Sequence, residues 1–341
     1  MDQSHINIFE LHDWLNALTD LHLIRKLMEY GILPKEGEYI CERCQHPLTL
    51  RVDNTRIDKY SWYCGNFILR RKQKRVRCDF RQSLRTGTFF AKSHLALGVV
   101  LKFIHFWVYN TPLNMIQFNL HLSTHTAVDL ANFCREVVFD QMIINSKPLG
   151  GPGVHVEIDE SKFGRRKYNR GHRVEGQWVF GGFERGSGEI FMVPVDSRDR
   201  LTLLPIIENW ILPGTTIHSD FWRAYDCLDD EGYNHLKVNH SVEYVDMETG
   251  ACTNHIEASW RVAKKHCDTG GRKKNFFAGY LAKYMFLKRC KLHHWDPFFQ
   301  FLSLAGQVCD ATKHSSTLTT DEDSNDEDTT GSEDTPYINC N

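Results

Sequence analysis

Three acidic residues, far apart along the chain, are the side chains best suited to chemistry. Asp159 ends one predicted strand, Asp220 ends another, and Glu257 lies near the start of a predicted helix. If the two strands are neighbours in a sheet, both aspartates emerge at the same edge, and the helix can lay its glutamate across that edge. Converging carboxylates repel one another and raise one another's pKa, so we expect them around cations rather than as a source of stability.

Carboxylate oxygens at such an edge suit divalent metal ions. Two Mg²⁺ ions about 3.5 to 4 Å apart can activate an attacking oxygen and stabilise a leaving one in an in-line displacement at phosphorus. Spacing alone leaves another interpretation open, in which Asp220 caps a helix and Glu257 is an ordinary first-turn acid. Among the neighbouring acids, Glu157 is expected on the face of its strand opposite to Asp159. Glu160 and Asp226 are expected to lie behind the metal ligands or at the surface.

Four of the eleven cysteines predict a structural metal site. Cys41 and Cys44 form a Cys-x-x-Cys pair, and Cys64 and Cys78 follow in the same segment, so four thiolates can close a tetrahedral shell around Zn²⁺. An insertion between Cys64 and Cys78 would explain their wide separation, and four unrelated buried thiols are the alternative. We expect reduced thiols, because the N-terminus has no basic stretch followed by an apolar one that would indicate secretion.

A dense basic stretch begins between the third and fourth of these cysteines. Residues 70–85 contain eight Lys and Arg against Asp79 alone, a density typical of segments that bind DNA phosphates. A nuclear localisation signal or a solvated basic face is the alternative interpretation. The candidate DNA contacts are Arg70, Arg71, Lys72, Lys74, Arg75 and Arg77.

Three modules are predicted before the first catalytic strand. They are a helical lead-in at residues 1–37, a zinc-ribbon-like DNA-binding module at 38–92 and a helix-turn-helix-like helical module at 93–149. The lead-in contains a helix over residues 20–30 that stops at Gly31. The helical module contains three helices, the last capped by Ser123 or Thr124.

A glycine and proline linker at residues 150–153 opens the domain that carries the three acids, which we place at residues 150–300. The expected elements are a strand through Val154, Val156 and Ile158, strands at 178–183 and 190–195, a helix at 201–211, a strand at 215–218 and a helix at 222–228. An antiparallel meander followed by alternating strand and helix is the order of an RNase H-like mixed-sheet α/β domain.

The folded part of the chain is mildly basic, although the net charge is −2. Eight acidic residues lie from Asp321 onward, which leaves 35 in the rest of the chain against 41 Lys and Arg. Residues 315–341 have almost no apolar side chains and predict an acidic disordered tail. The one long apolar run, residues 95–109, is too short and too polar to span a bilayer, so no membrane association is expected.

The order of several motifs resembles that of Merlin-type DDE transposases, eukaryotic relatives of a bacterial insertion-sequence transposase family. The shared motifs are Asp159-Glu-Ser-Lys-Phe, Lys167-Tyr-Asn-Arg-Gly171, Trp178-Val-Phe-Gly181, His218-Ser-Asp220, Thr253-Asn254 with Ile256-Glu257, Trp260 with Lys264, and Arg85-Thr-Gly-Thr-Phe-Phe after the cysteine module. The resemblance covers roughly residues 35–295. Several linked motifs in one order are more specific than any single motif.

The resemblance implies an RNase H-like core, dependence on Mg²⁺ or Mn²⁺, and cut-and-paste transposition at terminal inverted repeats in double-stranded DNA. It implies that Asp159, Asp220 and Glu257 are the catalytic metal ligands. Asn254 and Lys264 are candidate auxiliary residues, with a helix N-cap and a solvated lysine as the respective alternatives, and Trp260 is expected in the core. A basic segment after Asp159 is suited to binding the DNA strand that is cut, with an exposed hairpin without a partner as the alternative. Its candidate DNA contacts are Arg165, Arg166, Lys167 and Arg170.

Synapsis of two DNA ends predicts a homo-oligomer, and a DNA substrate predicts a nuclear location. The leading alternative is a host-recruited DNA-binding protein that keeps the fold without transposing. Its expected mark is a lost carboxylate, whereas all three are present. A zinc-containing adaptor that binds protein would be favoured if residues 70–85 failed to bind duplex DNA.

Overall fold

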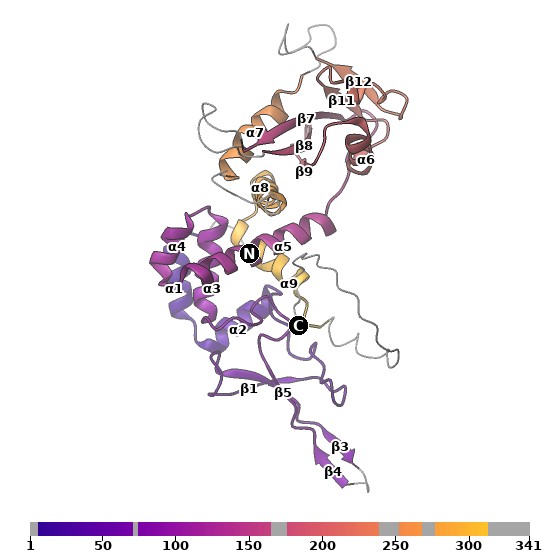
Figure 1. The fold of residues 1–341 in the computed structure, drawn as a ribbon. Coiled ribbons are helices and arrows are strands. Elements are labelled where there is room, and N and C mark those ends of the chain that lie inside the picture. Colours follow the sequence, from indigo (N-terminus) through magenta and orange to yellow (C-terminus); the bar gives the residue numbers. More distant parts are fainter. Residues whose placement is uncertain (1–5, 71–73, 165–175, 239–251, 268–276, 313–341) are drawn as a thin grey trace, which may run out of the picture. The chain divides into compact units, whose positions relative to one another are not determined.

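The computed structural model describes residues 6–70, 74–164, 176–238, 252–267 and 277–312. These residues form two compact units (Figure 1), one made of the chain up to Val137 together with the chain from Asp296 onward, and the other of Val138–Trp295. Several expectations lie outside the described residues. They are the candidate DNA contacts Arg71, Lys72, Arg165, Arg166, Lys167 and Arg170, and the tail at residues 315–341.

Helices make up most of the first unit. They are α1 (Ile8–Ala17), α2 (Asp20–Glu29), α3 (Leu97–Val108), α4 (Leu113–Leu120), α5 (Thr124–Ile144), which continues into the second unit, and α9 (Pro297–Val308). The helix predicted at residues 20–30 is confirmed as α2, and the three predicted after residue 93 are confirmed as α3, α4 and α5. The Ser123 hydroxyl caps α5 by accepting from the Thr126 N–H.

The sequence interpretation missed α1. Its signal is a capping box, in which the Asn7 side chain accepts from backbone N–H groups of the first turn and the Glu10 carboxylate accepts from the Asn7 N–H at 2.8 Å. Among the described helices, none is long and apolar enough to cross a membrane.

Short strands form the remainder of the first unit. β1 (Thr49–Val52), β2 (Tyr60–Tyr63) and β5 (Arg81–Ser83) pair antiparallel in the order β1-β2-β5. β3 (Phe67–Arg70) and β4 (Lys74–Arg77) form a separate antiparallel hairpin that leaves this sheet between β2 and β5. In Figure 1 the hairpin extends away from the three-stranded sheet.

A five-stranded mixed sheet organises the second unit. Its strands are β7 (His155–Phe163), β8 (Gln177–Glu184), β9 (Ile190–Val195), β11 (Thr216–Ser219) and β12 (Asn234–Lys237), in the order β12-β11-β7-β8-β9. β7, β8 and β9 form the predicted antiparallel meander, and β11 and β12 run parallel to β7. This mixed α/β topology fits an RNase H-like domain. A two-residue pairing of β6 (Leu149–Gly150) with β10 (Ile211–Leu212) closes one end.

Helices cover both faces of this sheet (Figure 1). On one face Leu203 and Ile207 of α6 (Arg200–Trp210) pack on Ile158 and its neighbours. On the other face the helices are α7 (Asn254–His266) and α8 (Phe277–Leu292), and their buried side chains include Trp260 and Leu281. The sheet is therefore the middle layer of three, and helices pack on both faces of its central strand β7.

Two local expectations are wrong. β7 does not end at Asp159, because it stays paired with β8 as far as Phe163, so the aspartate lies within the strand. The helix predicted over residues 222–228 is only the 3₁₀ turn η2 (Arg223–Tyr225), followed by further turns. Successive turns rather than one helix bring both Tyr225 and Leu228 into the core, where each is completely buried.

Candidate active site and cysteine cluster

The parallel pairing of β11 with β7 brings two of the candidate catalytic acids to one place. Thr216 lies opposite His155 and His218 opposite Glu157. Continuing this register by two residues sets Asp220 beside Asp159. Both side chains are half-buried, and Asp220 is oriented by the Trp222 backbone N–H, which donates to its Oδ1 at 3.0 Å.

The electrostatics of this edge favour a cation. Burial, with the Glu160 and Asp220 carboxylates acting in the same direction and the Trp260 N–H opposing them, raises the pKa of Asp159 to about 7. Burial also raises the pKa of Glu160 to about 7, with Asp220 acting in the same direction, while the Tyr225 hydroxyl that donates to Glu160 opposes the shift. The site therefore resists holding several negative charges by itself, which is the condition a divalent cation relieves.

Helix α7 lies along β7 and carries the third acid. The Trp260 indole N–H donates to Asp159 Oδ2 at 2.9 Å, and Lys264 Nζ donates to Ser161 Oγ at 2.7 Å. Glu257 precedes Trp260 by three residues, so it shares the helix face that contacts the strand. Its side chain is exposed, and its Oε1 accepts from the Thr253 hydroxyl at 3.2 Å.

The N-cap alternative for Asn254 is wrong. Thr253 occupies the N-cap position of α7, and Asn254 is the first residue of the helix, where its side chain is exposed. Asn254 therefore lies one turn from the Glu257 position without capping the helix.

Glu157 was expected on the opposite face from Asp159, and this is wrong because residues two apart in a strand share a face. Its carboxylate is completely buried and accepts from the backbone N–H groups of His255 and Ile256 at 2.8 and 3.1 Å. It also pairs with Arg185 Nε at 2.8 Å. Although burial acts to raise it, hydrogen bonds with the His255 side chain, Arg185 and the Ile256 N–H hold the pKa of Glu157 below its usual range. Glu157 thus anchors the first turn of α7, a role that the two-residue spacing could have suggested.

Trp260 is in the core, as expected, and it also orients Asp159. Gly181 lies opposite Asp159 on β8, and its lack of a side chain makes room for the indole. A Cβ at Gly181 would lie 2.7 Å from the Trp260 ring and 2.8 Å from the Phe191 carbonyl oxygen. The close approach of Trp260 and Phe191 therefore explains why the Trp178-Val-Phe-Gly181 motif ends in glycine.

Gly181→Ala is expected to lower the free energy of unfolding by about 1 to 3 kcal/mol, since the ring or the strand must move. It should also weaken any activity that depends on Asp159. Urea denaturation measures the first effect. Gly98→Ala is the matched control, because that Cβ would meet only Leu15 at 3.9 Å and would lie in a helix, where alanine is favoured. Equal stability of wild type and Gly181→Ala would contradict the steric argument.

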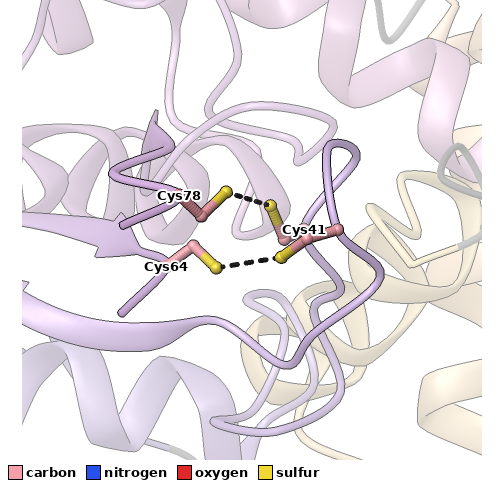
Figure 2. A group of neighbouring side chains, drawn as sticks. Cys41, Cys64 and Cys78 are labelled. Atoms are coloured by element: carbon pink, nitrogen blue, oxygen red, sulfur yellow. Dashed lines mark hydrogen bonds between the residues drawn. The ribbon is translucent and has the colours of Figure 1, made fainter. Parts of the chain in front are cut away.

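Four cysteines of the first unit, Cys41, Cys44, Cys64 and Cys78, converge (Figure 2). All four sulfur atoms lie within 4.8 Å of one another, with 3.6 Å between Cys41 and Cys78 and 3.3 Å between Cys44 and Cys64. Four sulfurs at about 2.3 Å from one Zn²⁺ would be about 3.8 Å apart, so the set fits a tetrahedral ion. Within the described ranges no other group of His, Cys, Asp and Glu side chains gathers this tightly. The carboxylates of Asp159, Asp220 and Glu257 are therefore farther apart than the four sulfur atoms.

The titration of the cluster also fits a cation. Burial raises the pKa of the Cys64 thiol to about 12. Burial acts on Cys44 in the same direction, but hydrogen bonds that involve Cys64 and the His46 backbone bring the Cys44 pKa to about 7. Without a metal ion, the four sulfurs cannot all carry negative charge at neutral pH.

The expected insertion between Cys64 and Cys78 is the β3–β4 hairpin. Its register sets Arg77 opposite Phe67 and Arg75 opposite Leu69, so these four side chains share one face. The Arg75 guanidinium lies 4.8 Å and that of Arg77 5.7 Å from the centre of the Phe67 ring. All four side chains are exposed, and Leu69 keeps 74% of its surface. Arg70 and Lys74 belong to the same two strands.

One basic residue of the 70–85 stretch is structural. Arg85 is buried and donates to both carboxylate oxygens of Asp58, at 2.7 and 2.5 Å, and to the Ser93 carbonyl at 2.8 Å. Each nitrogen of its guanidinium has a partner, so the charge available for a DNA partner comes from the hairpin and from the exposed Arg81 of β5.

Comparison with known proteins gives several matches. The model of a family described as "ISXO2-like transposase domain" matches residues 145–286, which include Asp159, Asp220 and Glu257. An "Uncharacterized transposase-like protein" of Haemophilus influenzae is 33% identical over 94 residues, which are 27% of this chain and 75% of that protein. Among solved structures, a cryo-EM structure of a simian T-cell lymphotropic virus intasome in complex with PP2A regulatory subunit B56 gamma is 11% identical with a TM-score of 0.27. That match covers 50% of this chain and 67% of the other.

Proposed function

This chain belongs to the ISXO2-like transposase family, and on that premise we propose that it is a Merlin-type DDE transposase. It cuts DNA at terminal inverted repeats and joins the freed ends to target DNA. The observation that carries the proposal is the position of Asp220, which directly follows β11, beside Asp159 on the neighbouring parallel strand β7, with the Glu257 helix bonded to Asp159 through Trp260.

Asp159, Asp220 and Glu257 are the proposed ligands of two Mg²⁺ or Mn²⁺ ions, and the mutual repulsion of the acids at this edge supports the assignment. Such ions, when bound, activate the attacking oxygen and stabilise the leaving one. The chain's own residues hold the ligands ready: Trp260 fixes Asp159, and the Trp222 N–H fixes Asp220. Water then attacks the phosphodiester at the element end, and the freed 3′ hydroxyl attacks target DNA, so no protein nucleophile is required.

The proposal is tested by incubating the full chain with DNA that carries the terminal repeats flanking its own reading frame. Cleavage should require Mg²⁺ or Mn²⁺ and should fall by a factor on the order of 10³ in Asp220→Ala, because a metal ligand is worth several kcal/mol at the transition state. Asp226→Ala is the control, since Asp226 is exposed and pairs only with Lys237 among the described residues. Specific binding without cleavage by the wild type would favour the host-recruited DNA-binding protein instead.

The hairpin supports a duplex-binding role. A two-stranded ribbon has the width to enter the major groove of duplex DNA. Its exposed face combines Arg75 and Arg77 with the apolar side chains of Phe67 and Leu69. The Phe67 ring restrains both guanidinium groups, which lowers the entropy lost when they bind phosphates. The cysteine cluster, with Zn²⁺ bound, would hold both ends of the hairpin.

Replacing both Arg75 and Arg77 by glutamine should weaken duplex binding and reduce the slope of log affinity against log salt by about 0.9 for each phosphate that is no longer neutralised. Fluorescence anisotropy with a labelled duplex over a salt series measures both quantities. Arg56→Gln is the control, because Arg56 is exposed and belongs to the turn between β1 and β2. An unchanged slope in the double variant would favour the protein-binding adaptor.

Two further assignments belong to the proposal. Bringing two DNA ends together requires at least two active sites, so we propose a homo-oligomer. The basic stretch of residues 70–85 would also serve nuclear import, which agrees with a nuclear location.

A further inference from the structure

The side chain of Arg198 is held between two indole rings next to the carboxylate edge. Its guanidinium carbon lies 4.0 Å from the centre of the Trp178 ring and 4.7 Å from that of Trp222. Arg198 lies in the short segment between β9 and α6 and is half-buried. A guanidinium in contact with two ring faces has less freedom than an exposed arginine on a flexible stem.

The stack is built from four separate parts of the domain. Trp178 belongs to β8, and Lys162, its partner on β7, places its Nζ 5.4 Å from the Trp178 ring centre. Trp222 follows β11; its indole N–H donates to the Arg198 carbonyl at 2.9 Å, and its backbone N–H donates to Asp220. The residue that orients a proposed metal ligand therefore also holds Arg198 in place.

The donors of this guanidinium are not used by the described part of the protein. There, the Arg198 side chain has ring contacts but no hydrogen bond or ion pair. Two other arginines of the unit differ, because Arg185 is bonded to Glu157 and Cys252, and Arg200 pairs with Glu231 at 3.3 Å. An oriented guanidinium with five N–H donors suits two oxygens of one phosphate group.

We infer that Arg198, clamped between Trp178 and Trp222, binds a phosphodiester of the DNA strand that enters the carboxylate edge. This inference rests on the proposed function. Lys162 supplies a second positive charge on the same indole. Phe221, between Asp220 and Trp222, keeps 63% of its surface and offers its ring to a base of that strand. The ligand class is a single DNA strand, recognised by its backbone and by stacking rather than by sequence.

A strand-binding assay without divalent metal tests the inference. The probe is a fluorescein-labelled single-stranded 12-mer with one 5-iodouracil. Every protein is the full chain with Arg75→Gln and Arg77→Gln, so that the hairpin contributes less. Arg198→Gln should weaken binding about tenfold to a hundredfold, as expected for one charge-assisted contact. It should also lower the salt slope by about 0.7. Arg200→Gln, two residues away and paired with Glu231, should bind within about twofold of its parent.

Photocrosslinking locates the strand, since iodouracil reacts with aromatic side chains in contact with it. Mass spectrometry should find the crosslink at Phe221 or Trp222, and Arg198→Gln should remove it. Arg198→Lys, which keeps the charge without the planar fork, should keep the salt slope and recover only part of the affinity. If the melting temperature shows that Arg198→Gln does not fold, the inference is tested by the affinities and salt slopes of Arg198→Lys and Lys162→Gln. A crosslink outside residues 220–222, or a Lys162→Gln salt slope equal to that of its parent, overturns the inference.

The two proposals fail separately. If strand binding depends on Arg198 but the protein does not cut DNA ends, the proposed Arg198 site is supported and the transposase chemistry is rejected. Normal cleavage of repeat ends together with an Arg198→Gln variant that binds and cuts like wild type would reject this site alone.

Discussion

Asp159→Asn is expected to abolish metal-dependent cleavage and, at pH 8 without divalent metal, to raise the stability of the protein. The loss of activity should be on the order of 10³-fold, because a proposed metal ligand is removed. The gain in stability should be about 1 to 3 kcal/mol, since the asparagine can still accept from Trp260 but no longer places a charge beside Glu160 and Asp220.

The pH dependence of that gain follows from the pKa of Asp159, which burial raises from an ordinary value of 3.8 to about 7. A raised pKa means that the folded state holds the proton more tightly than the unfolded state. The carboxyl group therefore favours folding below pH 3.8, and this contribution is lost as the pH rises through 7. The difference between wild type and Asp159→Asn should be largest above pH 7 and should disappear near pH 4.

Thermal unfolding with and without Mg²⁺ or Mn²⁺ checks the prediction. The metal should raise the melting temperature of the wild type, because binding to the folded state alone stabilises it, and should have little effect on Asp159→Asn. Asp226→Asn is the control, since that exposed acid forms its ion pair with Lys237. A metal-free Asp159→Asn protein less stable than the wild type at pH 8 would show that the acids do not repel one another as described.

Removal of zinc is expected to unfold the β1-β2-β5 sheet and to abolish duplex binding by the hairpin. Structural Zn²⁺ contributes on the order of 10 kcal/mol to the folding of small metal modules. The sheet has strands of only three or four residues, too short to be stable without further support. Cys64→Ser should have the same effect, because the Cys64 sulfur is completely buried in the cluster.

Three measurements test this prediction. Metal analysis should find one zinc per chain and less than half of that in Cys64→Ser. Hydrogen exchange should show loss of protection in residues 38–92 while β7 to β9 stay protected, and anisotropy should show loss of duplex binding. Cys227→Ser is the control, as this buried cysteine belongs to the other unit. A zinc-free chain that keeps its protection and its DNA binding would identify the cluster as four unrelated buried thiols.

The sequence by itself determined the elements whose signals are local. Apolar residues alternating with a period of two located β7, and two apolar segments separated by a turn located β8 and β9. Capping and stop residues located α2 and α5. The Cys-x-x-Cys pair indicated the cysteine cluster, and the wide gap before Cys78 indicated an insertion, which is the β3–β4 hairpin. These features depend on spacing along one segment, so they are readable without knowing what packs against it.

Only the tertiary structure decided which partners each of these residues meets. Glu157 holds the start of α7, Gly181 leaves space for Trp260, and Arg198 lies between two indoles. In each case the partner comes from a segment elsewhere in the chain, brought close by sheet register and packing. The same holds for the 3₁₀ turn η2, where a local helix signal gave way to the burial of Tyr225. Local propensity is worth only tenths of a kcal/mol per residue, whereas burial of one aromatic side chain is worth about 1.5 to 3 kcal/mol, so packing decides wherever the two conflict.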